Sequence, residues 1–396
     1  MVIEKIKSLA SQYHKDTVQI RRHLHQYPEL SFEEKETSNF IAQQLEQMGI
    51  AHQRGIADNG IVALIKGQQA DSRVVALRAD MDALPILEEN DISYKSKNEG
   101  KMHACGHDVH TASLLGAARI LNELKNDIYG TYKLIFQPGE EKLPGGASLM
   151  IKEGVLKNPT PASIIGQHVH PPLEVGKVGF RPGVYMASAD ELYITVKGKG
   201  GHAALPHNAV DTILITAHII IALQQIVSRN ADPTLPAVLT IGKINSTGGA
   251  TNIIPAEVKL QGTFRTLNED FRFKAHELMK NMAEQIAASM GGSCDFQVMV
   301  GYPFLKNDEV LTQKARAVAV EYLGEENVVD LNIRMTAEDF AYYSQEIPAC
   351  FYRLGTGNVA KGTTVPVHNS KFNVDEDGLE IGVGLMAMLA AKVDRN

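Results

Sequence analysis

Short apolar strands alternate with helical segments along much of the first half of the chain. Residues 74–77, 132–136 and 162–166 are apolar runs typical of buried strands, and apolar residues at helical spacing cover 111–125 and 146–154. A parallel pair of strands needs a crossover connection, usually a helix. The pattern therefore predicts an α/β fold with a mostly parallel central sheet.

Near residue 186 the pattern changes to strands in which apolar and polar residues alternate, as in antiparallel sheets with one solvated face. The strands are predicted at 191–196, 237–244, 258–265 and 295–300, and two helices at 209–228 and 268–289. The first pattern returns after residue 303 and ends in a helix at 376–392. We therefore expect a discontinuous catalytic domain, 1–186 and 300–396. Between its parts lies an inserted α+β domain, 187–299, with a four-stranded antiparallel sheet and two helices.

Composition argues against several classes of protein. The chain has 396 residues and a net charge of −7 without a cluster of Lys and Arg, so no nucleic-acid partner is expected. No continuous apolar run reaches about 18 residues, which argues against a membrane span. The N-terminus has no signal-peptide pattern, and Cys105, Cys294 and Cys350 are too few and too far apart for a disulfide framework. These features favour a cytoplasmic protein that acts on a small molecule.

Polar residues with catalytic potential follow each predicted strand: Arg78, Asp80 and Asp82, then Glu140 and Glu141, then His168 and His170. The segment 103–110, which contains three histidines, a cysteine and an aspartate, precedes a predicted helix. In open α/β sheets, ligands bind outside the carboxyl ends of the strands. We therefore expect these segments to converge in one cleft.

Cys105 and His107, two residues apart, offer a thiolate and an imidazole, which Zn²⁺ and neighbouring transition metals accept as ligands. Alone, the His-x-Cys-x-His triplet of residues 103–107 also fits an ordinary polar loop. Three more candidate ligands lie in loops or at strand ends: Glu141, His168 and His368. In the adjacent pair of glutamates at 140 and 141, one carboxylate can bind metal while the other removes a proton from metal-bound water. The sequence therefore predicts a metal site with a general base.

Several long motifs resemble, in order, those of the amidohydrolase branch of the dimetal aminoacylase and carboxypeptidase family. They are Arg78–Pro85, residues 103–111, Gln137–Glu141 and Gly198–Ala204. The resemblance runs nearly end to end, from Arg21 to the loop of His368. That branch includes N-acyl-amino-acid amidohydrolases, hippurate hydrolases, N-acetyldiaminopimelate deacetylases and auxin-conjugate hydrolases. It implies a zinc-exopeptidase-like catalytic domain with an inserted lid and dimerisation domain.

The resemblance also implies a role for each site residue. Cys105 would lie between two divalent ions, Mn²⁺ or Zn²⁺ first and Co²⁺ or Ni²⁺ as alternatives. His107, Glu141, His168 and His368 would complete the ligand set. Glu140 would be the general base, and Asp80 and Asp82 would orient ligands. His202 would reach the active site of a neighbouring subunit in a homodimer formed through the inserted domain, while Asn252 and Arg265 would hold the oxyanion or carboxylate of the substrate.

The implied reaction is hydrolysis of an N-acyl amino acid, such as an acetyl or benzoyl derivative, to a carboxylate and a free amino acid. Metal-bound hydroxide would attack the amide carbonyl. A dipeptidase or carboxypeptidase reaction remains an alternative, as does a non-catalytic binding protein on the same scaffold. Three features depart from the family pattern: Arg78, where the wider family has a histidine ligand, His170, expected as a pocket wall, and the Met335-Thr336-Ala337 segment. Asp339, just after that segment, is interpreted as the cap of the next helix.

Overall fold

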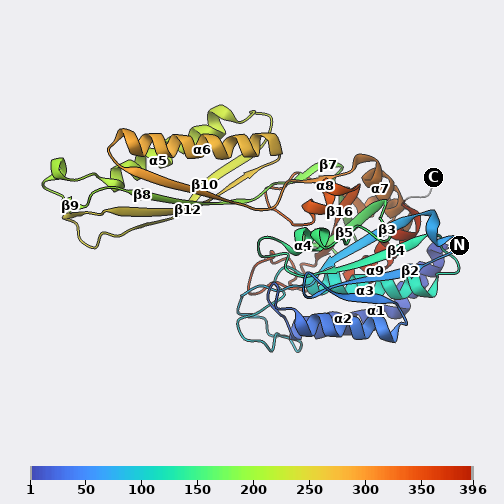
Figure 1. Ribbon diagram of the computed structural model, residues 1–396. Helices are drawn as coiled ribbons and strands as arrows, with labels where there is room; N and C mark the ends of the chain where they lie inside the picture. The colour runs from blue at the N-terminus through green and yellow to red at the C-terminus, as the bar shows by residue number, and fades with distance from the viewer. Residues whose placement is uncertain (1, 394–396) are drawn as a thin grey trace. The chain divides into compact units, whose positions relative to one another are not determined.

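The computed structural model describes residues 2–393, which form two compact units (Figure 1). Unit 1 comprises the chain up to Gly183, Lys306–Asn332 and the chain from Asp339. Unit 2 comprises Val184–Leu305 and Ile333–Glu338. The short strands β7 (Gly183–Met186) and β14 (Leu305–Asn307) lie where the chain passes from one unit to the other.

Unit 1 is built on an eight-stranded sheet in the order β1-β2-β4-β3-β5-β16-β6-β15. The strands are β1 (His52–Ile56), β2 (Gly60–Lys66), β3 (Val74–Asp80), β4 (Thr131–Gln137), β5 (Ser163–Glu174), β6 (Val178–Phe180), β15 (Val328–Asp330) and β16 (Ala349–Gly357). The four neighbouring strands β4, β3, β5 and β16 run parallel. The predicted α/β fold with a mostly parallel centre is therefore confirmed.

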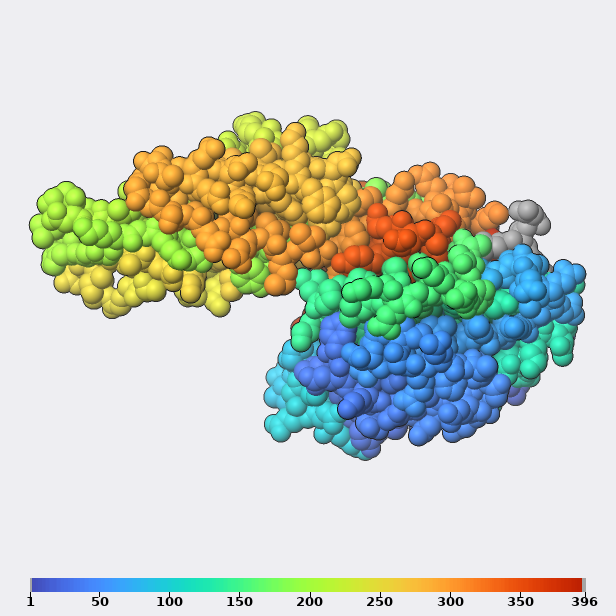
Figure 2. Space-filling model, in the orientation of Figure 1, coloured from blue at the N-terminus to red at the C-terminus, as the bar shows by residue number. Residues whose placement is uncertain are grey.

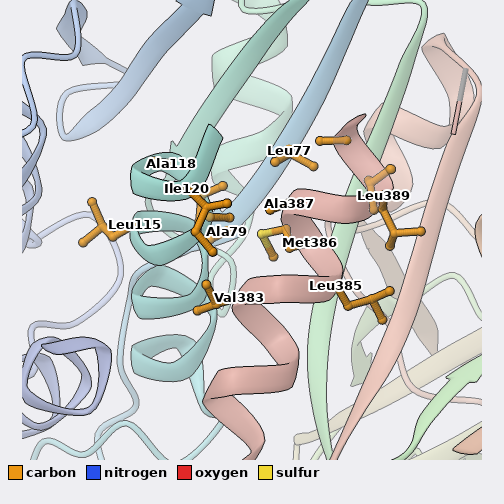
Figure 3. Packing of buried hydrophobic residues seen from close by; sticks show 14 of the residues in the cluster. Leu77, Ala79, Leu115, Ala118, Ile120, Val383, Leu385, Met386, Ala387 and Leu389 are labelled. Carbon is orange, nitrogen blue, oxygen red and sulfur yellow. The ribbon is translucent and has the colours of Figure 1, made fainter. Parts of the chain in front are cut away.

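Helices pack against this sheet. They are α1 (Val2–Gln26), α2 (Lys35–Gln47), α3 (His107–Glu123), α4 (Gly146–Lys152), α7 (Glu309–Leu323), α8 (Ala341–Glu346) and α9 (Gly378–Lys392), with 3₁₀ turns at Ala70–Ser72 and Glu325–Asn327. Figure 3 shows α3 and α9 side by side next to β3, with Leu77, Ala118 and Met386 among the buried contacts. Burying such apolar surface contributes roughly 25 cal/mol per Å². This packing fixes the start of α3, which carries part of the candidate site.

Unit 2 has a four-stranded antiparallel sheet in the order β10-β12-β8-β13, as predicted. Its elements are β8 (Asp190–Lys197), β9 (Gly201–His202), α5 (Thr212–Gln225), β10 (Ala237–Ser246), β11 (Ile253–Ile254), β12 (Glu257–Thr266), α6 (Glu269–Ser289) and β13 (Ser293–Val300). A 3₁₀ turn lies at Pro206–Asn208 and a π-helical turn at Ile226–Asn230. The helices bury an apolar face on the sheet through residues such as Ile215, Ile219 and Met279. Residues of α6 and β13, drawn in orange, cover much of the visible face of unit 2 in Figure 2.

The helical stretch Thr212–Asn230 is long and apolar enough to cross a membrane by length and composition alone. Of its most apolar window, 33% is buried within the structure. Polar residues such as His218 and Gln224 interrupt the stretch, so the sequence shows no continuous apolar run of this length. A helix in the core of a soluble protein meets the same criterion, so the stretch alone decides nothing about membranes.

Three local predictions were wrong. Helix α3 begins at His107 rather than at residue 111, because Gly106 takes a left-handed φ of +85° and turns the chain directly into the helix. Strand β5 continues past Gly166 and contains His168 and His170, because β16 pairs with this extension. Arg78 and Asp80 likewise lie within β3 rather than after it. The strands are thus longer than their apolar cores, because partners distant in sequence extend them.

Candidate metal centre

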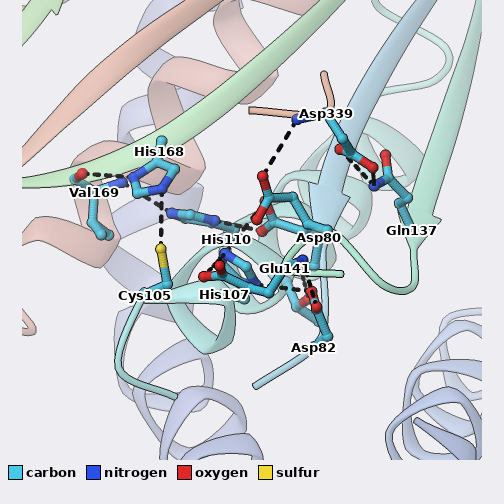
Figure 4. Close-up of polar contacts among 12 residues, drawn as sticks. Asp80, Asp82, Cys105, His107, His110, Gln137, Glu141, His168, Val169 and Asp339 are labelled. Carbon is cyan, nitrogen blue, oxygen red and sulfur yellow. Dashed lines mark hydrogen bonds and ion pairs between the residues drawn. The ribbon is translucent and has the colours of Figure 1, made fainter. Parts of the chain in front are cut away.

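The five predicted metal ligands lie together in unit 1, and Figure 4 labels four of them, Cys105, His107, Glu141 and His168. Cys105 precedes α3, His107 begins it, Glu141 follows β4, His168 lies on β5 and His368 follows β16. The ligand atoms of Cys105, His107 and His168 lie within 4.8 Å of one another, and so do those of Cys105, Glu141 and His368. Cys105 belongs to both groups.

One of two distances between ligand atoms lies in the range that two ligands of one ion require, and the other is about 0.2 Å shorter. Sγ of Cys105 lies 3.5 Å from Nε2 of His168, and Nε2 of His368 lies 3.1 Å from Oε1 of Glu141. Ligands at about 2.0–2.3 Å from a tetrahedral Zn²⁺ are separated by roughly 3.3–3.8 Å. The residues present therefore fit a transition-metal cluster, and Cys105 is placed to serve both halves of it.

Hydrogen bonds fix the tautomers of two buried histidines. Nδ1 of His168 donates to the carbonyl of Val169 at 2.8 Å, and Nδ1 of His107 donates to Asp82 at 3.1 Å. In the neutral form of each imidazole, Nε2 then carries the lone pair that can bind a metal. Nε2 of His107 is buried and makes no hydrogen bond within the described part of the chain. Asp82 therefore stands where a residue that orients a ligand is expected.

The field in the cluster favours positive charge. Burial lowers the pKa of His107, but Asp80 and Cys105 outweigh it and leave this pKa well above the ordinary value. Hydrogen bonds to Cys105 and then to Glu141 raise the pKa of His368 to about 10. Burial and then Glu141 raise the pKa of the Cys105 thiol. A divalent cation would satisfy all three residues, because it attracts thiolate, imidazole and carboxylate together.

The pKa of His168 is shifted in the opposite direction to those of His107 and His368, and this shift also suits a metal ligand. Its side chain is buried, and burial followed by the charge of Arg353 lowers its pKa well below the ordinary value. The imidazole is therefore neutral near pH 7 and keeps its lone pair available.

A second cluster, formed by Asp80, His107 and His110, also brings ligand atoms together. It is already occupied by protein contacts. Oδ1 of Asp80 accepts from Nδ1 of His110 at 2.6 Å, and Oδ2 accepts from Arg78 at 2.6 Å. Nε2 of His110 accepts from the backbone N–H of Val169 at 2.9 Å. Asp80 and His110 are therefore satisfied by protein contacts, and His107 is the member of this cluster whose Nε2 has no hydrogen bond in the described part of the chain.

Glu140 lies beside the ligands with a buried side chain. Ligand atoms of Glu140, Glu141 and His107 fall within 4.8 Å of one another, and Oε1 of Glu140 accepts from the backbone N–H of Asp339 at 3.3 Å. The prediction that Asp339 caps a helix was wrong: α8 has Phe340 at its N-cap, without a side-chain capping bond. The buried carboxylate of Asp339 instead accepts hydrogen bonds from Arg78, Gln137 and the backbone N–H of Ala147.

The remaining predicted site residues belong to unit 2. His202 and Asn252 are exposed and line one shallow cleft, where the backbone N–H of Ala203 donates to the Asn252 carbonyl at 2.9 Å. Arg265 on β12 is partly buried, and its Nη1 donates to the carbonyl of Met335 at 3.1 Å. Met335 lies in the segment that departs from the family pattern, so this departure stands next to a predicted substrate contact.

Comparisons with known proteins identify the family of this chain. The model of peptidase family M20/M25/M40 matches residues 76–392. Thermostable carboxypeptidase 1 of Saccharolobus solfataricus is 39% identical over 394 residues, which cover 99% of this chain and 98% of that protein. The N-acyl-L-amino acid amidohydrolase of Geobacillus stearothermophilus is 44% identical over 310 residues, 78% of this chain and 83% of that protein.

Among solved structures, Bacillus subtilis YxeP, described as a dinuclear metal binding peptidase from the M20 family, is similar with a TM-score of 0.81. It shares 34% sequence identity, and the match covers 96% of this chain and 98% of that one. The resemblance found in the sequence motifs is thereby confirmed. The chain belongs to peptidase family M20/M25/M40 and is a hydrolase.

Proposed function

We propose that the protein hydrolyses the amide bond of N-acyl amino acids, releasing a carboxylate and a free amino acid. The observation that carries the proposal is the buried Glu140 carboxylate, placed next to five candidate metal ligands without being needed to complete either ligand group that contains Cys105. A similar arrangement of base and ligands serves metal-assisted hydrolysis in general. The name of the Geobacillus relative, N-acyl-L-amino acid amidohydrolase, supports this substrate class.

Cys105, His107 and His168 would hold one ion, and Cys105, Glu141 and His368 the other, with Mn²⁺ or Zn²⁺ as the expected metals and Co²⁺ or Ni²⁺ as alternatives. When bound, such ions polarise a carbonyl oxygen and lower the pKa of water. Glu140 would take a proton from the attacking water and deliver it to the leaving nitrogen. Positioned proton transfer of this kind contributes about 10²–10⁴ in rate.

The residues of unit 2 would recognise the substrate. Arg265 is suited to the carboxylate of the amino acid, because the planar guanidinium matches it in a bidentate fork. His202 and Asn252, which line one cleft, would support the oxyanion. We also propose that residues 187–299 act as a lid and dimerisation domain, and that His202 serves the active site of the second subunit.

Exposed apolar residues on α5 support a homodimer through unit 2. Ile213, Leu214 and Ile221 are 46%, 50% and 72% exposed, although their types favour burial. A second copy that packs on this face would remove them from water. The three free cysteines are consistent with a reducing compartment, and we propose the cytoplasm.

A carboxypeptidase reaction is the second candidate, because the Saccharolobus relative carries that name and matches almost the full chain. Both reactions attack an amide next to a free carboxylate. They differ in what lies on the acyl side: a simple acyl group, or an amino acid with a free or blocked amine.

A substrate panel with the metal-loaded protein tests the proposal. We expect N-acetyl and N-benzoyl amino acids to be hydrolysed faster than dipeptides in Mn²⁺ or Zn²⁺. Glu140→Gln should lower kcat by about 10² or more while metal content stays unchanged. Glu99→Gln, at an exposed position, is the control. Full activity of Glu140→Gln would contradict the role of the base, and preferential cleavage of dipeptides would favour the carboxypeptidase.

A further inference from the structure

The 138–146 loop, which runs from the end of β4 to the first residue of α4, carries both glutamates of the site. Asp339 contacts the residue on each side of this loop, Gln137 and Ala147. Nε2 of Gln137, at the end of β4, donates to Oδ1 and Oδ2 of Asp339 at 2.9 and 2.7 Å. The backbone N–H of Ala147, in the first turn of α4, donates to Oδ2 at 2.9 Å. Figure 4 shows the pairing of Asp339 with Gln137. The carboxylate of Asp339 therefore binds the chain on both sides of the 138–146 loop.

Asp339 also contacts the middle of the 138–146 loop. Its own backbone N–H donates to Oε1 of Glu140 at 3.3 Å, across 199 positions of sequence. The side chain of Asp339 thus contacts the residues on both sides of the loop, and its backbone N–H contacts the carboxylate of Glu140 within the loop.

The 138–146 loop has little freedom to shift between these contacts. The backbone N–H of Gly146 donates to the carbonyl of Gly139 at 3.0 Å and closes the loop on itself. A Cβ atom added at Gly146 would lie 1.6 Å from the carbonyl oxygen of Pro138. A small displacement of either end would therefore move Glu140.

The charge of Asp339 is balanced inside the protein. The residue is fully buried, and Nη2 of Arg78 donates to its Oδ1 at 2.7 Å. The same guanidinium donates to Asp80 at 2.6 Å through Nη1. A buried carboxylate is costly unless it is paired and hydrogen-bonded, and the carboxylate of Asp339 accepts from Arg78, Gln137 and Ala147. Such an arrangement exceeds what a helix cap would need.

We propose that Asp339 is a positioning residue that holds Glu140 in place for proton transfer. The proposal rests on the proposed function, in which Glu140 is the base. Asp339 acts through the 138–146 loop and does not itself take part in the reaction.

The test compares Asp339→Asn with a matched variant, Asp375→Asn, in the metal-loaded protein. Asp375 is also buried, and its carboxylate accepts from Lys361 at 2.7 Å and from Asn358 at 2.6 Å. Asparagine keeps the size of the side chain but turns an NH₂ group toward donors that need an acceptor. We expect Asp339→Asn to lower kcat about 10²-fold with KM and metal content nearly unchanged, and Asp375→Asn to keep kcat.

A double-mutant cycle adds a readout that a merely structural role would not produce. If Asp339 works through Glu140, the kcat of Glu140→Gln/Asp339→Asn should equal that of Glu140→Gln within about threefold, because residues that act as a unit are not additive. If Asp339→Asn fails to fold, Gln137→Met carries the test. That variant removes the hydrogen bonds between Gln137 and Asp339 and should lower kcat about tenfold.

The outcomes separate the two proposals. A kcat of Asp339→Asn or Gln137→Met equal to that of Asp375→Asn would overturn the role of Asp339, and so would loss of bound metal in parallel with activity. An inactive Glu140→Gln beside a fully active Asp339→Asn would overturn this inference alone. A fully active Glu140→Gln would overturn the proposed function and, with it, the positioning role of Asp339.

Discussion

The carboxylate of Asp82 accepts a hydrogen bond from Nδ1 of His107 across 3.1 Å, and this contact decides which nitrogen of His107 faces the candidate metal centre. Oδ2 of the same carboxylate accepts from the backbone N–H of Glu141 at 3.0 Å and from Ser31 at 2.6 Å. Asp82 therefore ties together two of the proposed ligands.

Asp82→Asn should weaken metal binding more than it slows catalysis. An asparagine can still accept through its oxygen, but it lacks the charge that strengthens the bond to His107. Removing such a partner typically costs about 10–100-fold in metal affinity. Titration of the metal-free variant with Zn²⁺ or Mn²⁺ measures the effect, with Asp91→Asn at an exposed position as control. Equal affinities for the two variants would refute the role of Asp82.

Cys105→Ser should change which metal the protein prefers. A hydroxyl is a harder ligand than a thiolate, so affinity for Zn²⁺ should fall more than affinity for Mn²⁺. Competition between the two ions, followed by elemental analysis of the bound metal, checks this. Cys350→Ser is the control, because Cys350 is buried in the apolar core away from the ligand groups. An unchanged ratio of bound Zn²⁺ to Mn²⁺ would show that the sulfur is no ligand.

Gly146→Ala should destabilise unit 1 by about 3 kcal/mol or more and abolish activity. The added Cβ would meet the carbonyl oxygen of Pro138 at 1.6 Å, and a backbone atom cannot rotate away as a side chain can. Gly249→Ala, where a Cβ would meet nothing within 4 Å, is the control. Denaturant unfolding gives the two free energies. A wild-type value for Gly146→Ala would show that the 138–146 loop is looser than the structure indicates.

Glu34 should make stability depend on pH. The side chain is fully buried, and burial followed by the charge of Asp82 raises its pKa to about 7 from 4.5. The folded state holds this proton more tightly than the unfolded state. The contribution of Glu34 to the free energy of unfolding is therefore greatest below pH 4.5. It declines as pH rises to about 7, by on the order of 3 kcal/mol.

Unfolding free energies of the wild type and Glu34→Gln, measured from pH 4.5 to 8, test this. The stability of the wild type should fall relative to that of Glu34→Gln as pH rises, because glutamine stays uncharged. Parallel curves would show that Glu34 ionises at its ordinary pKa in the folded protein.

Periodicity and motif order predicted the α/β sheet, the antiparallel sheet of unit 2 and the convergence of Cys105 with His368. They did not predict where β5 ends, because its extension depends on β16, which pairs His168 with Arg353. Nor did they predict the contacts of the Asp339 carboxylate, because a Glu-Asp pair before a helix has the pattern of a cap. Its partner Gln137 lies 202 positions earlier. The Gln-Pro-Gly-Glu-Glu motif contained a usable signal: an amide at a buried strand end needs a partner.

The place of β16 between β5 and β6 has a consequence for the order of events during synthesis. Strand β16 (Ala349–Gly357) completes the sheet between β5 and β6, and both Asp339 and His368 lie close to it in sequence. A growing polypeptide on the ribosome therefore has neither a finished sheet nor a complete set of ligands. We therefore expect no hydrolysis by the growing chain before residues up to His368 have been synthesised.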